Sequence, residues 1–354
     1  MSLLELSLKA MIKLSFQPKQ ATKKLLSGLN ERSKDVLIRR YGLSPKDTSK
    51  STLESIGKKY NITRERVRQI EEHSLSAIRK SELYKEVSPN IDEIFNVIKE
   101  IGAVVSEKEL LEEFAKTEAA QNHIHFLLVI GDPFYKKKEN EHFTHRWYTD
   151  ADLVNKVEES IKKLYQSLRS EDIVDESKMI QTFLSHLQGV SEEYKNEEIA
   201  RRWLRLSKKI NSNPLGEWGR ADSSNINVKG IRDYAYLVIR RHGSPIHFRE
   251  VAESITNLFG KKAHIATCHN ELIKDPRFVL VGRGLYALTE WGYSTGVVRD
   301  VIKDILEKNG PLTGDEIVEK VLKERYVKEN TIMVNLQNGS EFERASDGKY
   351  FLKI

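Results

Sequence analysis

Cysteine is almost absent from this chain: Cys268 is the single cysteine among 354 residues. One thiol can form neither an intrachain disulfide nor a cysteine-rich zinc site. Ten histidines are present, and the pairs His123/His125 and His142/His145 lack the HExxH spacing of metalloproteases. We therefore expect ordinary core or surface histidines, with no metal and no cofactor.

Long apolar runs are missing as well. No stretch approaches the roughly 20 consecutive apolar residues that a membrane span requires. The chain is 39% hydrophobic and 31% charged, which is typical of a soluble folded protein with enough apolar content for its cores. Glu5, Lys9 and Lys13 interrupt the apolar residues at the start, so residues 1–24 predict an amphipathic N-terminal helix and no signal peptide.

The usual signatures of an enzyme are also lacking. The sequence has no P-loop, no metal-ligand cluster and no nucleophile elbow. An enzyme acting on DNA remains an alternative, because Asp132 in VIGDPFYKKKEN precedes lysines as in some nucleases, but a loop entering a hairpin explains this stretch better. We expect no catalytic residue and no small-molecule substrate.

Positive charge is unevenly distributed along the chain. The net charge is +6, yet residues 1–88 hold 19 Lys/Arg and 10 Asp/Glu, a net +9, which leaves 39 and 42, a net −3, for the remainder. A local basic face is the electrostatic footprint of a polyanion binder. A basic surface without a binding role would have the same charge, so the sequence motif within this segment must distinguish the two interpretations.

Residues 31–82 predict a helix-turn-helix. Helices are expected over 31–41, where Gly42 is a stop signal, and over 52–60. Thr63 stands where the N-cap of a third helix belongs. In that helix Val67, Ile70, Ser74 and Ile78 recur at helical spacing and predict a buried stripe.

The first turns of that third helix have the side chains that read bases. Arginine bonds guanine, glutamate accepts from the cytosine amino group and glutamine suits adenine, so Arg64, Glu65 and Gln69 are the predicted base readers. The recognition helix of a helix-turn-helix enters the major groove with this end. Thr63, Arg66 and Arg68 are predicted to hold phosphates.

The run LNERSKDVLIRRYGL…STLESIGKKYNITRERVRQIEEHSLSAIRK resembles region four of the primary bacterial sigma factors, over about residues 25–82. In that family the domain binds the −35 promoter element and docks on the β flap of RNA polymerase. The resemblance implies base reading by Arg64, Glu65 and Gln69, and its phosphate-contacting positions fall on Arg40, Thr52, Leu53, Glu54 and Arg68. The loop 44–51 departs from the family in length and charge.

The rest of the chain predicts further small modules of one kind. Residues 228–293 predict three helices and a hairpin around Gly282-Arg283-Gly284, which is a winged helix. The run HFREVAESI…DPRFVLVGRGLYALTEWG resembles the HARE-HTH family, a module also found in the delta subunit of bacterial RNA polymerase. Lys261, Lys262, Arg277 and Arg283 are its candidate phosphate or partner contacts.

The predicted fold class is mainly α, with tandem helix-turn-helix and winged-helix modules that carry small β-hairpin wings. The expected organisation is an N-terminal helix (1–24), the sigma-like helix-turn-helix (25–88), a winged-helix-like module (89–149), a helical module (150–220), the HARE-HTH winged helix (221–293) and a C-terminal winged-helix-like module (294–354).

The sequence thus predicts a DNA-binding transcription regulator that recognises −35-like double-stranded promoter DNA and contacts RNA polymerase through its β flap. No segment resembles the sigma region that melts the −10 element, so it is expected to act as a regulator and not as a complete sigma factor. The expected location is the cytoplasm, at the bacterial nucleoid, with no membrane partner. The alternative is a polymerase-associated scaffold, akin to the delta subunit, with only non-specific DNA binding.

Overall fold

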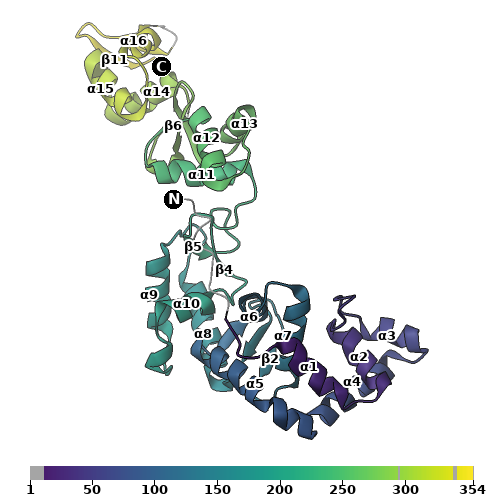
Figure 1. Ribbon diagram of the computed structural model, residues 1–354. Coiled ribbons are helices and arrows are strands. Elements are labelled where there is room, and N and C mark those ends of the chain that lie inside the picture. The colour runs from purple at the N-terminus through teal and green to yellow at the C-terminus, as the bar shows by residue number, and fades with distance from the viewer. Residues whose placement is uncertain (1–11, 294–295, 338–340, 354) are drawn as a thin grey trace. The chain divides into compact units, whose positions relative to one another are not determined.

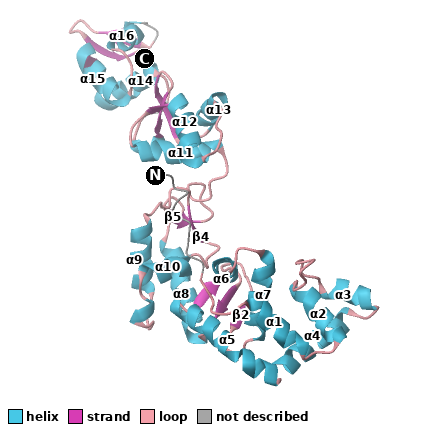
Figure 2. Cartoon of the chain, viewed as in Figure 1, coloured by secondary structure: helices cyan, strands magenta, loops and turns pink. Residues whose placement is uncertain are grey.

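The computed structural model describes residues 12–293, 296–337 and 341–353. Helices dominate these residues, and the short strands form small antiparallel sheets (Figures 1 and 2). The predicted mainly α fold is therefore confirmed. The chain divides into two compact units, unit 1 (Met1–Asn211) and unit 2 (Ser212–Ile354). Within the described residues, no helix combines the length and apolar character needed to cross a membrane.

In unit 1, from residue 12 onward, five helices precede the first strand. Its elements are α1 (Pro18–Ser27), α2 (Glu31–Tyr41), α3 (Leu53–Tyr60), α4 (Arg64–Arg79), α5 (Glu82–Glu100), β1 (Val104–Ser106), α6 (Glu107–Phe114), α7 (Glu118–Ile130), β2 (Tyr135–Lys137), β3 (Arg146–Tyr148), α8 (Ala151–Ser167), α9 (Glu176–His186) and α10 (Glu197–Leu204). Strands β1, β3 and β2 form an antiparallel sheet in that order.

The start of the chain differs from the expected helix over 1–24. Residues 1–11 lie outside the described residues, residues 12–17 are not helical, and α1 begins at Pro18. Proline is suited to the first helical turn, because its missing N–H has no partner there in any case. The first described helix therefore starts only near the end of the predicted segment.

One hydrophobic core runs through most of unit 1. It extends from Leu25 in α1 through Leu37 in α2 and Ile78 in α4 to Phe126 in α7 and Trp147 in β3. The segments expected as separate modules, 25–88 and 89–149, thus bury their apolar faces against each other.

Helix α5 joins the two expected modules without a break, because it continues through Pro89. An interior proline removes one backbone hydrogen bond. Val87, Ile91, Ile94 and Ile98 form a fully buried stripe around it, and this burial offsets the lost bond. The expected boundary at 88/89 falls inside this helix.

Unit 2 contains two similar sets of elements. Strand β4 (Ile210–Ser212) spans the boundary between the units, and β5 (Trp218–Arg220) lies near the start of unit 2. The first set is α11 (Ile231–His242), β6 (Ile246–His247), α12 (Phe248–Phe259), α13 (Ile265–Lys274), β7 (Phe278–Gly282) and β8 (Leu285–Leu288). The second set is α14 (Val298–Asn309), β9 (Leu312–Thr313), α15 (Gly314–Glu324), α16 (Glu329–Gln337), β10 (Phe342–Arg344) and β11 (Lys349–Leu352). Their three-stranded sheets have the orders β6-β8-β7 and β10-β11-β9.

The helices and hairpins expected in 228–293 and 294–354 are all present in unit 2. The segment expected as a helical module (150–220) contains α8, α9 and α10, and it ends in the short strands β4 and β5. The grouping of these elements into winged-helix modules stays a prediction.

Candidate nucleic-acid interface

Helices α2, α3 and α4 form a helix-turn-helix at one end of unit 1 (Figure 1). Val36, Ile56 and Val67, one from each helix, make a small buried cluster between them. Gly42 ends α2 in the left-handed conformation, as the sequence predicts. Thr63 caps α4, since its side chain accepts a hydrogen bond from the Arg66 backbone N–H at 3.2 Å.

The turn between α3 and α4 depends on Gly57. A Cβ atom at this position would stand 2.7 Å from the carbonyl oxygen of Ile62. The tight approach that requires glycine therefore comes from the turn. Asn61 adds the left-handed residue that reverses the chain.

The outer face of α4 is polar. Val67, Ser74 and Ile78 are buried, as predicted, and Ile70 is half-buried. The exposed side chains of the first turns are those of the predicted base readers Arg64, Glu65 and Gln69, together with Arg66 and Arg68.

Ion pairs connect the side chains of this face. Arg68 lies between two carboxylates, with its Nη2 2.6 Å from Glu65 Oε1 and its Nη1 paired with Glu72. The hydrogen bond from Arg68 lowers the pKa of the Glu65 carboxyl, and the two glutamates raise the pKa of Arg68. Arg66 Nη1 donates to Gln69 Oε1 at 3.0 Å. Among the described residues, no hydrogen bond or ion pair engages the Arg64 side chain.

The phosphate-contact candidates outside α4 lie around the start of α3. Arg40 Nη1 donates to the Ser51 carbonyl at 3.3 Å, and its Nε lies 3.4 Å from Glu71 on α4. Arg40 thus connects the segment before α3 with α4. Thr52 is the N-cap of α3 and Leu53 packs into the helix-turn-helix core.

Glu54 is exposed on the first turn of α3 and pairs with Lys58 at 3.1 Å. An exposed pair of this kind contributes little to stability. Both side chains are therefore available to rearrange when a partner approaches.

In unit 2, Arg277 is already engaged within its own module. Its Nη2 lies 2.9 Å from Asp233 and 2.7 Å from Asp275, and only 23% of the side chain is exposed. Burial alone would lower the pKa of Arg277, but the hydrogen bonds to both aspartates raise it. These contacts explain Arg277 as a structural residue.

The other three candidates of unit 2 lie at the surface to different degrees. Lys262 and Arg283 are exposed, before α13 and in the β7–β8 turn. Lys261 is half-buried, with its Nζ 4.6 Å from the centre of the Tyr234 ring. Their part in binding stays a prediction.

Helix α13 occupies the place in its module that α4 has in the helix-turn-helix, yet it exposes apolar side chains. Ile265 is 45% exposed and Ile273 is 62% exposed. Leu280, on strand β7 that packs against α13, is 48% exposed. Exposed large apolar side chains suit a protein partner better than a phosphate backbone.

The described part of the chain contains no group of three or more His, Cys, Asp or Glu residues placed to hold a metal ion. Asp132, the residue with a faint nuclease likeness, accepts a hydrogen bond from Tyr84 Oη at 3.2 Å and lies 3.5 Å from Arg79 Nε. These contacts join the segment after α7 to the end of α4 and the start of α5, and they account for the aspartate.

Sequence reasoning missed three residues near the interface. Lys46 and Lys50 are exposed in the loop between α2 and α3, where the altered loop length hides any correspondence with the family. Asn122 on α7 is buried at 2% exposure and bonds that loop. No sequence signal identified it, because its partners are backbone carbonyls about 75 to 80 residues earlier in the chain.

Comparison with known proteins supports the resemblance over one segment. Residues 25–80 match the family model "Sigma-70, region 4". The RNA polymerase sigma factor RpoD of Helicobacter pylori is 53% identical over 55 residues, which is 16% of this chain and 8% of that protein. The sigma factor SigA of a Nostoc species is 50% identical over 56 residues, 16% of this chain and 14% of that protein. In SigA of Clostridium acetobutylicum the identity is 39% over 74 residues, 21% and 19% of the two chains.

The matched segment contains α2, α3 and α4, and so all three predicted base readers. Its similarity indicates a sigma-factor-like, DNA-binding role related to RNA polymerase, and the family is a DNA-binding domain and not an enzyme. The matches cover no more than 19% of the length of these relatives.

Proposed function

We propose that this protein is a DNA-binding transcription regulator that recognises a −35-like promoter element and contacts RNA polymerase, including its β flap, at the bacterial nucleoid. The observation that carries the proposal is the outer face of α4. There Arg64, Glu65 and Gln69 are exposed on a helix whose opposite face is buried and whose start is capped by Thr63. The match of residues 25–80 to sigma region 4 supports the same role.

On DNA, the first turns of α4 enter the major groove. Arg64 is free of protein partners in the described part of the chain and can bond guanine O6 and N7. Glu65 and Arg68 are paired in the free protein. If Arg68 turns to a phosphate, Glu65 is released to accept from a cytosine amino group. Glu65 thus exchanges Arg68 for the cytosine amino group, and its carboxylate is not left without a hydrogen-bond donor next to DNA.

The remaining predicted contacts bind the phosphate backbone of the DNA. Arg40, beside the segment that enters α3, and Thr52, at the start of α3, lie where the first helix of a helix-turn-helix crosses the phosphates. Such contacts fix the register of the protein on the duplex and carry no base information. They add the salt-dependent part of the affinity.

Fluorescence anisotropy with two duplexes tests the proposal. One duplex carries the −35 consensus and the other its scrambled sequence, and each is measured at two salt concentrations. We expect a preference of about 10³-fold for the consensus that survives the higher salt. Equal binding to both duplexes that collapses with salt would show that the arginines hold phosphates only.

A second function is favoured by unit 2. The exposed Ile265 and Ile273 of α13 fit a protein partner better than a phosphate backbone. With the β6-β8-β7 sheet and three helices, we infer that residues 228–293 form a HARE-HTH-like winged helix that docks on RNA polymerase as a scaffold.

Co-purification separates the two functions. Polymerase is captured from nuclease-treated lysate with the wild-type protein or with the Ile265→Ser/Ile273→Ser variant. We expect the wild type to retain polymerase and the variant to retain less, while both bind the consensus duplex equally. Equal capture by the two proteins would remove α13 from the docking surface.

A further inference from the structure

The loop between α2 and α3, residues 42–52, is held from behind by a buried side chain of α7. Asn122 Nδ2 donates to the Gly42 carbonyl at 3.0 Å and to the Thr48 carbonyl at 2.8 Å. Only 2% of Asn122 is exposed. A buried amide that satisfies two backbone carbonyls fixes the loop at both points, because losing either bond would leave a polar group unpaired.

Further contacts fix the remainder of the loop. Thr48 Oγ1 donates to Glu118 Oε2, also on α7, at 3.2 Å. The Ser51 N–H donates to the Arg39 carbonyl at 2.9 Å. The chain passes so close to Gly42 that a Cβ there would stand 2.2 Å from the Thr48 oxygen, and Gly42 has φ +64°. The α2–α3 loop therefore has one shape, set mainly by α7.

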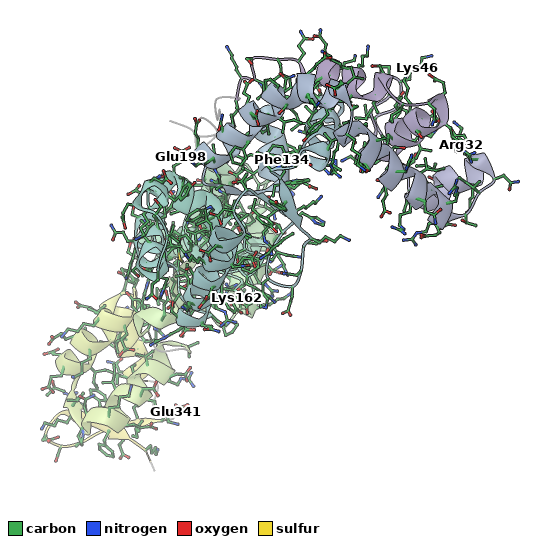
Figure 3. The ribbon with its side chains drawn as sticks, turned by 90° about the horizontal axis from the view of Figure 1, so that it is seen from below. Arg32, Lys46, Phe134, Lys162, Glu198 and Glu341 are labelled. Carbon is green, nitrogen blue, oxygen red and sulfur yellow. The ribbon has the colours of Figure 1, made fainter. Side chains whose placement is uncertain are left out.

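This fixed loop presents two lysines to solvent. Lys46 and Lys50 are exposed, and Lys46 lies at the outer edge of the part of unit 1 that contains α2 to α4 (Figure 3). Asp47 is the one carboxylate among residues 42–52. It is engaged within the loop, where it accepts hydrogen bonds from the backbone N–H and the hydroxyl of Ser49.

Lys50 lies close to the start of α3 and to charged side chains of both signs. Lys50 precedes Thr52, the cap of α3, by two residues. Burial of its amine lowers the pKa of Lys50, as do the nearby charges of Lys136 and Arg40, while Glu107 and Glu118 act in the opposite direction.

We propose that the α2–α3 loop is a second phosphate-binding element of the DNA interface, in which Lys46 and Lys50 contact the backbone of the duplex and Asn122 positions them. The proposal rests on the proposed function and extends its contact surface beyond the positions that the sigma resemblance assigns. Lysine suits this role because its ammonium acts as a compact charge for phosphate. A loop that is already ordered loses little further conformational entropy on binding.

The proposal gives α7 and the helices packed with it a function. They support the DNA-binding surface from behind, since Asn122 fixes the loop while Arg79 at the end of α4 donates to the Ile130 carbonyl at 3.0 Å and the Val129 carbonyl at 2.8 Å. The helix-turn-helix and α7 thus act in binding as one body.

The first experiment compares Lys46→Ala/Lys50→Ala with the wild type on the consensus and scrambled duplexes over a range of salt. We expect affinity for both duplexes to fall about tenfold or more, and the slope of log K against log salt to flatten by about 2. The preference for the consensus should stay unchanged. The matched control is Lys163→Ala/Lys178→Ala, which removes two exposed lysines from α8 and α9 and should leave affinity and slope unchanged.

The second experiment tests the positioning role of Asn122. Asn122→Ala should weaken DNA binding in the wild-type background and have little additional effect in the Lys46→Ala/Lys50→Ala background, because both changes remove the same contact. Additive losses would overturn the positioning role. If Asn122→Ala does not fold, the lysine variants still decide whether the loop binds phosphate.

The outcomes separate this proposal from the proposed function. A wild type that prefers the consensus, with lysine variants that keep its affinity and salt slope, overturns the loop proposal alone. A wild type that binds both duplexes equally, with weakened lysine variants, overturns base reading and supports the loop. A wild type that binds neither duplex overturns both.

Discussion

Helices α4 and α13 are each the third helix of a small three-helix group, and they differ in what they expose. The outer face of α4 is composed of arginines, glutamates and a glutamine, whereas α13 exposes Ile265 and Ile273. Both helices bury an apolar stripe, so packing alone would assign them one function. The comparison teaches that the three-helix scaffold sets only the position of the helix, and that its exposed side chains decide the partner.

The largest expected effect follows from removing the polar face of α4. The triple change Arg64→Ala/Glu65→Ala/Gln69→Ala should abolish the preference for the consensus duplex, a loss of about 10³-fold, since each base contact discriminates by about 1–3 kcal/mol. Anisotropy with the consensus and scrambled duplexes measures the loss.

The matched change on α13, Ile265→Ser/Ile273→Ser, should leave that preference intact. If the α13 variant loses the preference for the consensus duplex, or the α4 variant keeps it, the proposed difference between the two helices is wrong. Circular dichroism of both proteins controls for loss of fold, because all five side chains are exposed.

The two units that contain these helices should also respond to opposite extremes of pH. In α7 of unit 1, burial shifts the pKa of His125 from its ordinary 6.5 to about 4, and nearby Lys50 acts in the same direction. Within α13, burial raises the pKa of the Cys268 thiol from 9.0 to about 11. Shifts of this size correspond to about 3 kcal/mol each.

The signs follow from which state binds the proton. Below pH 6.5 the unfolded chain protonates His125 and the folded chain does not, so unit 1 should lose stability from pH 6.5 down to about 4. Above pH 9 the unfolded chain releases the Cys268 proton and the folded chain keeps it, so unit 2 should lose stability from pH 9 to 11.

Urea unfolding at a series of pH values measures both trends. His125→Gln should reduce the acid loss without removing it, because the pKa of the buried His123 is also lowered. Cys268→Ala should likewise reduce the alkaline loss without removing it, because burial also raises the pKa of Tyr236 and Tyr286 in unit 2. A steep acid slope that persists in full in the His125 variant would show that another group causes it.

The glycines that precede the two helices, Gly57 before α4 and Gly260 before α13, differ in why the backbone requires glycine. A Cβ at Gly57 would stand 2.7 Å from the Ile62 oxygen, whereas nothing lies within 4 Å of one at Gly260, which has φ +63°. We expect Gly57→Ala to lower the free energy of unfolding by about 2 kcal/mol through the clash, and Gly260→Ala by about 1 kcal/mol through the left-handed backbone. Equal losses in urea unfolding would mean that the α3–α4 turn adapts.

The sequence predicted the helix-turn-helix in detail because its signals are local. Gly42, Thr63 and the stripe that includes Val67 each act within one or two turns of the chain, and each has the predicted role in the structure. The same holds for the hairpin after α13, where Gly282 ends β7 and Gly284 lies in the turn before β8.

Features that depend on distant parts of the chain were not predictable. Pro89 marks a boundary by its local preference, yet burial on both sides carries α5 through it. Asn122 looked like one polar residue in an apolar helix, and only the fold brings it to the carbonyls of Gly42 and Thr48. The exposure of Ile273 required knowledge of which side of α13 packs.

The smallest expected effect concerns the caps of the two helices. Thr63 caps α4 with its side chain, but His264, the residue in the same place before α13, makes no capping hydrogen bond despite a suitable extended backbone (φ −73°, ψ 134°). Thr63→Ala should therefore cost about 1 kcal/mol, and His264→Ser should gain up to about 1 kcal/mol. Urea unfolding of the two variants measures both changes, with Thr63→Ser as a control that keeps the cap. The exposed isoleucines of α13 belong to the proposed docking surface, so the effect of this cap on polymerase capture is also informative. If His264→Ser stabilises unit 2 and also strengthens capture, docking orders the start of α13. If it stabilises unit 2 and leaves capture unchanged, the docking surface is limited to the exposed isoleucines.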